Sequence, residues 1–275
     1  MALFETHRNV FVTGASGVLG TRVVSLLRRL QPLWTVIPVG VDLRDAQAIS
    51  SFCEASERPD MLFHLAAVVP TARVDNDPLG AYEVNSLGAG RIFQAMLSKN
   101  PKLWGLYVSS SHVYASSESP LTEDSKICPA SAYGRTKLAG EFLVTDLFDA
   151  EGKGNLCIAR VFSMYSPDQD RSFLYPNLLS QKRDSVISGN KVEVHGWDNV
   201  RDFLDADTVA DYLVGLGFSG ADGVFNIGSG IGTSVGAFAS EVVGIEPDLA
   251  ERFKSPGQTT LVANVSKLRS HLSGT

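Results

Sequence analysis

Tyr133 and Lys137 are the residues of this chain whose types and spacing most directly suggest chemistry. They lie four residues apart in a segment typical of a helix, so their side chains project from neighbouring turns of one face. An ammonium group near a phenol favours the phenolate, and could make a group with an ordinary pKa of about 10 useful as a base near neutral pH. This spacing is common by chance. Its weight comes from a glycine-rich turn near the N-terminus and a serine triplet over 109–111.

The glycine-rich turn, Thr13-Gly14-Ala15-Ser16-Gly17-Val18-Leu19-Gly20, joins a predicted strand over 9–13 to a predicted helix over 18–30. In such a turn the first glycine permits the tight bend, the second lets a pyrophosphate approach the backbone, and the third allows close packing of the helix. The free N–H groups at the start of the helix attract phosphate oxygens. The pattern therefore predicts a dinucleotide site with the residues Gly14, Ser16, Gly17, Val18, Leu19 and Gly20.

Strand-like apolar segments alternate with amphipathic helical segments through the first two-thirds of the chain. The predicted strands are 9–13, 34–39, 61–66, 103–109 and 156–162, and the predicted helices are 18–30, 45–55, about 78–97 and 132–147. This alternation predicts an α/β fold with a doubly wound parallel sheet. Shorter elements beyond Tyr165 indicate a small C-terminal substrate-binding domain. We expect a dinucleotide-binding domain over 1–165, to which 200–228 return, and a partly interleaved substrate-binding region over 166–275.

Composition and charge argue against several other classes of protein. The 275 residues can bury one large core, and 44% hydrophobic and 20% charged residues are ordinary for a globular protein. A net charge of -6 argues against binding to nucleic acid or to an anionic membrane surface. Cys53, Cys128 and Cys157 have no metal-like spacing, and residues 1–8 contain no signal peptide or membrane span. We expect a cytoplasmic protein with no metal site.

Three more segments complete a pattern with the glycine turn. They are His64-Leu65-Ala66-Ala67, Val108-Ser109-Ser110-Ser111-His112-Val113-Tyr114 and the run from Tyr133 to Glu141. In this chain order they resemble the extended short-chain dehydrogenase/reductase family of sugar-nucleotide epimerases and reductases, from Asn9 to about Gly230. The resemblance implies a Rossmann-type sheet, NAD(P) as cofactor, a nucleotide-sugar substrate and a homodimer.

The resemblance also implies a role for each member of a catalytic triad. Ser110 hydrogen-bonds the reacting oxygen, Tyr133 exchanges its proton, and Lys137 binds the nicotinamide ribose and lowers the pKa of Tyr133. This division is chemically consistent, because hydride removal from a carbinol carbon requires removal of the hydroxyl proton at the same time. The cofactor carries the hydride, and the protein aligns the reactants and supplies the proton.

Further cofactor contacts implied by the resemblance lie at strand ends and in one helix. They are Asp42, Leu43, Leu65, Ala66, Ala67, Asn85, Val108 and Val161, in addition to Tyr133 and Lys137. Small side chains at 65–67 leave room for the cofactor. Asn85 either supports Lys137 through water or is a polar helix residue that faces solvent.

The choice between NAD and NADP depends on the segment after the second predicted strand. Asp42 follows Gly20 by about the number of residues at which an acidic residue is expected in this fold. Such a residue accepts a hydrogen bond from the ribose 2′-hydroxyl of NAD. Alternatively, Asp42 lies beside the adenine ring, the ribose falls near Gly40, and Arg44 faces a 2′-phosphate. The second interpretation favours NADP slightly. Asp42 or Asp45 could also simply cap the following helix.

The residues implied for the substrate are Ser110, Ser111, His112, Tyr133, Ser163 and Arg201. The segment from Val200 to Asp205 resembles one whose Arg contacts a substrate diphosphate, and an Arg fork suits phosphate by charge and geometry. Ser163 and Ser166 depart from the Asn and Gly that are usual at their positions. Arg201 could instead form a structural ion pair with Asp202.

Two positions beside Ser110 narrow the reaction. Dehydratases of the family carry an Asp-Glu pair there, whereas this chain has Ser111 and His112, so dehydration by the usual route is not expected. His112 is either an acid/base near neutral pH or a hydrogen-bonded histidine at the strand end. Epimerisation or reduction of a nucleotide sugar through Tyr133 remains, with dehydrogenation of a small polyol or keto substrate as an alternative. A non-catalytic NAD(P)-binding protein would not need the intact triad.

Overall fold

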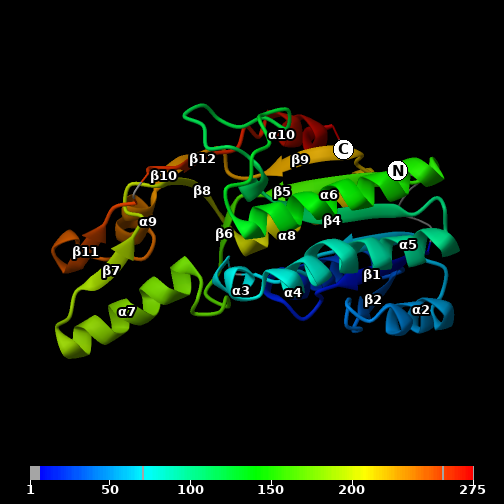
Figure 1. Ribbon diagram of the computed structural model, residues 1–275, viewed down its shortest axis with the longest axis horizontal. Coiled ribbons are helices and arrows are strands. Elements are labelled where there is room, and N and C mark those ends of the chain that lie inside the picture. The colour runs from blue at the N-terminus through cyan, green and yellow to red at the C-terminus, as the bar shows by residue number, and fades with distance from the viewer. Residues whose placement is uncertain (1–6, 70, 256, 275) are drawn as a thin grey trace.

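The central feature of the fold is a parallel sheet of six strands. The computed structural model describes residues 7–69, 71–255 and 257–274. The strand order is β2-β1-β3-β4-β5-β9, and every neighbouring pair is parallel. The strands are β1 (Asn9–Thr13), β2 (Thr35–Val39), β3 (Met61–His64), β4 (Trp104–Ser110), β5 (Asn155–Val161) and β9 (Gly223–Ile227). The predicted doubly wound α/β fold is confirmed (Figure 1).

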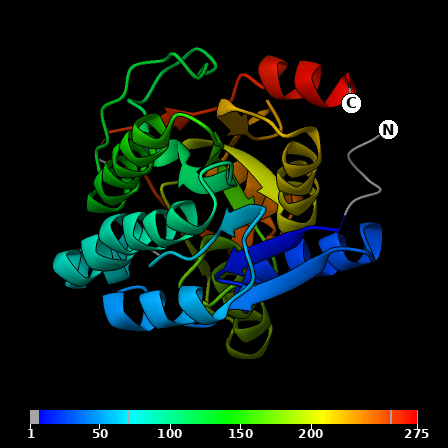
Figure 2. The same cartoon turned by 90° about the vertical axis from the view of Figure 1, so that its right-hand side faces the viewer.

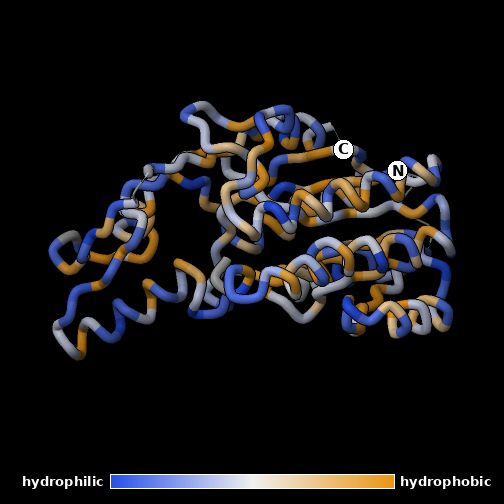
Figure 3. Tube along the Cα trace, in the orientation of Figure 1, coloured by the Kyte–Doolittle hydropathy of each residue, from blue (hydrophilic) through white to orange (hydrophobic). Residues whose placement is uncertain are grey.

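Helices cover both faces of this sheet (Figure 2). One face packs against α1 (Val18–Leu30) and α8 (Ala206–Ser219), and the other against α2 (Ala46–Ala55), α5 (Ala89–Lys99) and α6 (Ala132–Glu151). Strand alternation decides which core each residue joins, so Val10 and Val12 pack with α1 whereas Phe11 packs with α5. Figure 3 shows hydrophobic residues gathered along the strands and the adjoining helix turns. Within the described ranges, no helix is both long and apolar enough to cross a membrane.

The predicted helix over 78–97 is interrupted in the structure. The chain forms α3 (Thr71–Asn76), α4 (Pro78–Tyr82) and a π-helical turn, η1 (Glu83–Gly88), before α5 begins. A π turn is wider than an α turn and is often found at functional sites. Asn85 lies within it and is completely buried.

A smaller lobe lies beside the sheet (Figure 1). It contains α7 (Leu174–Ser188), α9 (Val235–Glu241), the turn η3 (Pro247–Leu249), and the parallel pair β7 (Val192–His195) and β11 (Ala250–Phe253). The lobe has its own hydrophobic core, which includes Leu178, Val194, Phe238 and Ile245. It is therefore held together by packing that is separate from the cores of the large sheet.

A short mixed sheet lies between the lobe and the six-stranded sheet (Figure 1). Its central strand β8 (Val200–Asp205) pairs with β6 (Ser163–Tyr165), β10 (Gly232–Ser234) and β12 (Thr260–Leu261). Within the segment 200–228, α8 and β9 thus join the large sheet, whereas β8 does not. The domain boundaries given above stay a prediction.

Both edge strands of the six-stranded sheet carry a feature that discourages further pairing. Pro38 in β2 has no N–H to donate. At β9, the Lys267 ammonium from α10 (Ser266–Ser273) donates to the Val224 carbonyl oxygen at 2.6 Å. Neither edge therefore presents a complete row of backbone hydrogen-bonding groups.

Candidate active site

A cavity of about 920 Å³ opens at the carboxyl ends of β1, β3, β4 and β5 and extends to the smaller lobe. Parallel sheets bind ligands at this edge. The structure brings nearly all the predicted site residues to the wall of this one cavity. They are Gly14, Ser16, Gly17, Val18, Leu19, Gly20, Asp42, Leu43, Leu65, Ala66, Ala67, Val108, Ser110, Ser111, His112, Tyr133, Lys137, Val161, Ser163 and Arg201. Asn85 is the exception.

The glycine turn forms one end of the cavity, and its three glycines have different requirements. Gly14 has a φ of +66°, and a Cβ there would lie 2.7 Å from the Ala66 nitrogen. A Cβ on Gly20 would lie 2.0 Å from the Gly14 carbonyl oxygen, so this glycine lets α1 pack on the turn. At Gly17 the nearest atom would be 3.3 Å away. Packing therefore requires Gly14 and Gly20, while Gly17 leaves its backbone open to the cavity.

The first turn of α1 presents backbone donors that no side chain caps. Gly17 is the N-cap and makes no side-chain hydrogen bond, and the first turn contains no acidic residue. By contrast, Asp45, Ser131 and Asp205 cap α2, α6 and α8 with their side chains. An uncapped helix N-terminus attracts phosphate oxygens through its N–H groups and its dipole. The turn and α1 therefore fit the pyrophosphate of a dinucleotide.

Asp42 lines the cavity, but its carboxylate is already paired with the Arg44 guanidinium. The two side chains form an ion pair at 2.6 Å, and the Arg44 N–H donates to the same carboxylate at 2.9 Å. The side-chain hydrogen bonds from Arg44 lower the pKa of Asp42 to about 2. Asp45, and not Asp42, caps α2, because its Oδ1 accepts a hydrogen bond from the Ala48 nitrogen. Gly40 has open space on its side-chain side, with nothing within 4 Å of a Cβ placed there.

Tyr133 lies in the first turn of α6 and Ser110 at the end of β4, so a helix and a strand bring the two hydroxyls together. Burial raises the pKa of Tyr133 to about 12, while the neighbouring Ser110 hydroxyl acts to lower it. Desolvation of the phenolate is the larger effect. Tyr133 is therefore protonated at neutral pH. The lowering of the Tyr133 pKa by Lys137 stays a prediction.

Lys137 is almost completely buried, and its ammonium nitrogen lies 4.2 Å from the centroid of the Tyr107 ring. Burial lowers the pKa of Lys137 to about 7, and the Glu141 carboxylate, one helical turn further along α6, acts to raise it. His64 stacks on the Tyr107 ring with 5.7 Å between centroids. Burial, and then the Lys137 charge, lower the pKa of His64 to about 3. Lys137 thus titrates near neutral pH beside a neutral imidazole.

A buried polar network that sequence reasoning missed lies behind the triad. The Glu141 carboxylate pairs with the Arg160 guanidinium through two hydrogen bonds, of 2.7 Å and 3.0 Å, and accepts a third from the Ser109 hydroxyl. Arg160 also donates to the Tyr114 phenol at 2.9 Å. Glu141 and Arg160 are both more than nine-tenths buried. Because Ser109 precedes Ser110 on β4 and Glu141 lies on α6, this network fixes the strand and the helix that carry the triad.

Asn85 is fully buried, so its interpretation as a solvent-facing residue is wrong. Its side-chain oxygen accepts a hydrogen bond from the Val68 N–H at 2.7 Å, and its amide donates to the Thr136 hydroxyl at 3.0 Å. Its backbone oxygen accepts from the Tyr107 hydroxyl at 3.0 Å. Asn85 therefore ties η1 to the chain after β3, to β4 and to the residue that precedes Lys137.

His112 lines the cavity beside Tyr133. Burial, and then the charge of Arg201, lower the pKa of His112 to about 4, so its imidazole is neutral at neutral pH. The ring packs edge-on against the Tyr133 ring, with 5.7 Å between centroids. A neutral imidazole in this place does not supply the acid that dehydration requires.

Arg201 reaches the cavity from β8 and is anchored by Thr259. Its guanidinium donates to the backbone oxygen and to the hydroxyl of Thr259, each at 2.8 Å. The buried Asp202 carboxylate instead accepts hydrogen bonds from the N–H groups of Ser229 at 2.7 Å and Ala263 at 3.1 Å. Among the described residues, no ion pair joins Arg201 to Asp202, so that alternative is wrong.

Aromatic residues of the smaller lobe and of the short mixed sheet line the same cavity, and sequence reasoning missed them. Phe203 and Phe238 stack with 3.9 Å between centroids, and Tyr165 and Tyr175 meet edge to face at 5.2 Å. Tyr165 also packs against Phe238 at 5.3 Å. These residues come from four separate elements, so no local motif could have revealed the cluster. It adds an aromatic wall to the cavity that holds the triad.

Comparison with known proteins tests the relationship that these features suggest. The model of the “NAD dependent epimerase/dehydratase family” matches residues 10–228. The chain belongs to this family. GDP-6-deoxy-D-mannose reductase from Pseudomonas aeruginosa is 30% identical over 231 residues, which cover 81% of this chain and 75% of that protein. GDP-6-deoxy-D-talose 4-dehydrogenase from Aggregatibacter actinomycetemcomitans is 28% identical over 82% of this chain and 76% of that protein.

A solved structure has the same architecture as this member of the NAD dependent epimerase/dehydratase family. RMD from Pseudomonas aeruginosa, complexed with NADPH, is 27% identical with a TM-score of 0.84, over 96% of this chain and 92% of that one. The resemblance inferred from the motifs is confirmed. The chain is an NAD(P)-dependent enzyme of the extended short-chain dehydrogenase/reductase type.

Proposed function

We propose that the chain catalyses the NADPH-dependent reduction of a 4-keto group on a nucleotide sugar. The observation that carries the proposal is that Ser110, Tyr133 and Lys137 meet at the wall of one cavity, in a chain similar to GDP-6-deoxy-D-mannose reductase. Reduction of a ketone requires a proton donor at the carbonyl oxygen, and the Tyr133 phenol is ready to act as one. Oxidation requires the phenolate first, which burial disfavours here.

Each residue of the triad has one task in this reaction. The Ser110 hydroxyl donates a hydrogen bond to the keto oxygen and orients it. NADPH, when bound, would supply the hydride that the carbonyl carbon receives. Tyr133 gives its phenolic proton to the oxygen, so the C=O becomes a CH–OH group. Lys137 holds the ribose of the cofactor, and its ammonium stabilises the negative charge left on the Tyr133 oxygen.

The surroundings of the predicted adenosine end favour NADP over NAD in this proposal. The Asp42 carboxylate is paired with Arg44, so it does not present a free negative charge to a 2′-phosphate. Open space at Gly40 leaves room for that group. RMD, which was solved with NADPH, is similar in sequence and fold. Comparison of the Kd values of NADPH and NADH by fluorescence tests this preference, and tighter binding of NADH would contradict it.

The cavity supports a nucleotide sugar as substrate. Its volume of about 920 Å³ lies at the upper end of the range for small-molecule sites. Arg201 is held at its wall, where a guanidinium can bind a diphosphate through paired hydrogen bonds. The partly exposed rings of Tyr165, Tyr175 and Phe203 also line the cavity and offer aromatic surface to a base.

A turnover assay tests the proposal directly. We expect purified protein to oxidise NADPH in a 1:1 ratio with reduction of a 4-keto-6-deoxy nucleotide sugar, measured at 340 nm across GDP, UDP and dTDP sugars. Epimerisation is the second candidate, because the matching family model includes epimerases and the same triad can serve both reactions. Interconversion of two nucleotide sugars by protein that retains its cofactor, with no net change in absorbance, would overturn the reductase proposal.

We also propose that the protein is a homodimer that associates through α4, η1 and α6. These elements pack against one another and expose Leu79, Leu87 and Phe142, which are 80%, 44% and 63% accessible. An exposed apolar surface of this kind supports a protein interface. We expect Phe142→Glu to convert a dimer to a monomer in sedimentation velocity, and a monomeric wild type would contradict the proposal.

A cytoplasmic location is the compartment that the thiols support. Cys53, Cys128 and Cys157 are all free, and two of them are buried. Free thiols persist where the environment is reducing. Fractionation of cells that express the tagged chain tests this, and recovery outside the cytoplasm would contradict it.

A further inference from the structure

The ammonium group of Lys137 lies over an aromatic ring in the interior of the protein. Its nitrogen is 4.2 Å from the centroid of the Tyr107 ring, which belongs to β4. The Lys137 side chain is 1% exposed, and none of the ion pairs within the described ranges joins it to Glu141. A buried ammonium loses its proton readily, because its charged form is poorly solvated. The groups that surround Lys137 therefore decide whether it is charged.

The Tyr107 ring is fixed in its place by three contacts. Its hydroxyl donates to the Asn85 backbone oxygen at 3.0 Å and lies 3.3 Å from that of Lys137. The His64 imidazole stacks on the ring, with 5.7 Å between centroids and 10° between planes. Gly140 leaves room for the hydroxyl, because a Cβ there would lie 2.1 Å from its oxygen. Packing therefore sets the position of the ring before any ligand binds.

The other titratable side chains near Lys137 differ in what they offer its charge. Burial, and then the Lys137 charge, lower the pKa of His64 to about 3, so the imidazole is neutral. Tyr133 is also neutral, because burial raises its pKa to about 12. The Glu141 carboxylate favours the ammonium from one helical turn further along α6. The face of the Tyr107 ring has a negative potential that attracts a cation, and it lies directly beside the nitrogen.

We propose that Tyr107 is a positioning residue, whose ring face keeps the Lys137 side chain charged and in place at the wall of the active-site cavity. The inference rests on the role proposed above for Lys137, which holds the ribose of the cofactor and stabilises the negative charge on the Tyr133 oxygen. A charged ammonium stabilises a developing anion, whereas a neutral amine does not. Tyr107 is 0% exposed, so it acts through Lys137 and not by contact with a ligand.

NMR of the full chain without cofactor tests the contact directly. Lysine labelled with ¹³C at Cε gives a signal for each side chain, and the signal that Lys137→Met loses belongs to Lys137. The ring current of Tyr107 should shift the attached Lys137 protons upfield. This measurement needs no replacement of the buried Tyr107, and an ordinary chemical shift for these protons would overturn the proposal.

Replacements of Tyr107 separate the ring face from the hydroxyl. Tyr107→Leu and Tyr107→Met remove the aromatic face, and should lower the pKa of Lys137 by about one unit, which is a tenfold loss of the charged form. Tyr107→Phe is the matched control, because it loses the hydroxyl but keeps the face. It should reduce the stability and leave the Lys137 pKa unchanged. An unchanged or raised pKa in a folded aliphatic variant, or an equal drop in Tyr107→Phe, would refute the role of the ring.

The same titration distinguishes this inference from the proposed function, because it needs no substrate. The expected pKa shift in protein that reduces none of the 4-keto nucleotide sugars would reject the reductase proposal and leave the effect of Tyr107 on Lys137 in place. Full reductase activity with a Lys137 pKa that Tyr107→Leu does not lower would reject the role of Tyr107 alone.

Discussion

Lys137 and Arg8 are cations at opposite edges of one sheet, and the protein surrounds them differently. Lys137 has Glu141 one helical turn away, and that carboxylate continues through Arg160 into a buried network. Arg8 lies over Trp34 in a pocket whose lining has no acidic residue. Among the described residues, the charge at the carboxyl edge has a carboxylate beside it, whereas no ion pair includes Arg8 at the amino edge.

Tyr133→Phe gives the largest expected effect and tests whether the two edges act independently. Loss of the proton donor should lower kcat by about 10²–10⁴-fold, while NADPH binding stays within error. Turnover at 340 nm and calorimetry on the same preparation measure both effects. Arg8→Gln is the matched control at the amino edge, and it should leave kcat unchanged. Turnover retained by Tyr133→Phe would reject the assigned proton donor.

Glu141→Gln should cost about 3–5 kcal/mol of folding stability, because it leaves the buried Arg160 without a counter-charge. Arg8→Gln should change the stability by less than about 1 kcal/mol, since no ion pair among the described residues is lost. Urea unfolding of the two variants measures the contrast. The double variant Glu141→Gln/Arg160→Met should recover much of the loss, because it leaves no unpaired charge. Equal stabilities for the two single variants would remove the distinction between the edges.

The stability contribution of Lys137 should depend on pH. Its pKa is about 7 in the folded protein against an ordinary value of 10.5. Between these values the unfolded chain binds a proton that the folded chain does not, so stability rises with pH. Relative to Lys137→Met, the wild type should gain about 1 kcal/mol for each pH unit between pH 7.5 and 9.5. Urea unfolding of both proteins without cofactor provides the measurement, and a constant difference would show that Lys137 keeps an ordinary pKa.

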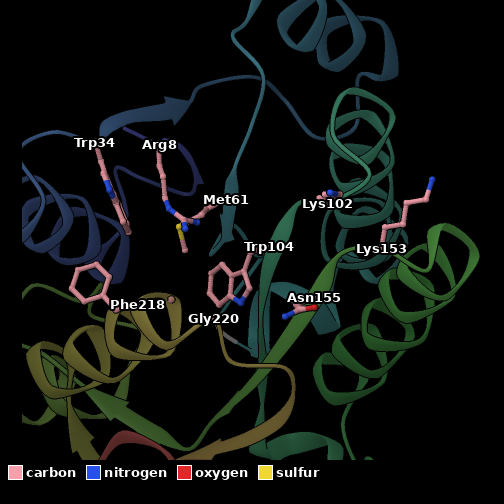
Figure 4. A pocket seen from close by; sticks show the side chains of 10 residues that line it. Arg8, Trp34, Met61, Lys102, Trp104, Lys153, Asn155, Phe218 and Gly220 are labelled. Atoms are coloured by element: carbon pink, nitrogen blue, oxygen red, sulfur yellow. The ribbon is translucent and has the colours of Figure 1, made fainter. Parts of the chain in front are cut away.

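Trp34 and Trp104 line a cavity of about 290 Å³ at the amino ends of the strands (Figure 4). Their replacement gives the smallest expected effect and the most closely matched pair of variants. Trp34 and Trp104 are 7% and 6% exposed, so replacement of either by Phe removes a similar amount of packing. Trp104→Phe also leaves the buried Ala221 carbonyl oxygen unpaired, and should cost about 1 kcal/mol more than Trp34→Phe. Thermal and urea unfolding check the difference. A larger cost for Trp34→Phe would mean that its N–H is satisfied within the protein.

Local patterns revealed most of the fold and the triad. The glycine turn, the alternation of strands and helices, and the spacing of Tyr133 and Lys137 each depend on residues close together in the sequence. Such signals survive in a single sequence because a turn or a helix face is specified locally. Apart from the interrupted helix over 78–97, the bounds of the predicted strands and helices accordingly differ from the observed ones by only a few residues.

Long-range features could not be predicted in this way. Glu141 and Arg160 look like ordinary surface charges in the sequence, and only the packing of α6 on β5 brings them together in the interior. The π turn around Asn85 mixes polar and apolar residues as an α-helix does, so the sequence does not distinguish the two. Arg8, Trp34 and Trp104 come from three separate segments and line one cavity at the amino ends of the strands. In each case the signal is a tertiary contact.

The closed edges of the six-stranded sheet determine how this protein can self-associate. Pro38 in β2 and the Lys267 ammonium at β9 both obstruct the addition of a further strand. Association of native molecules edge to edge through this sheet is therefore disfavoured, so contacts between copies have to use helix faces or the smaller sheets.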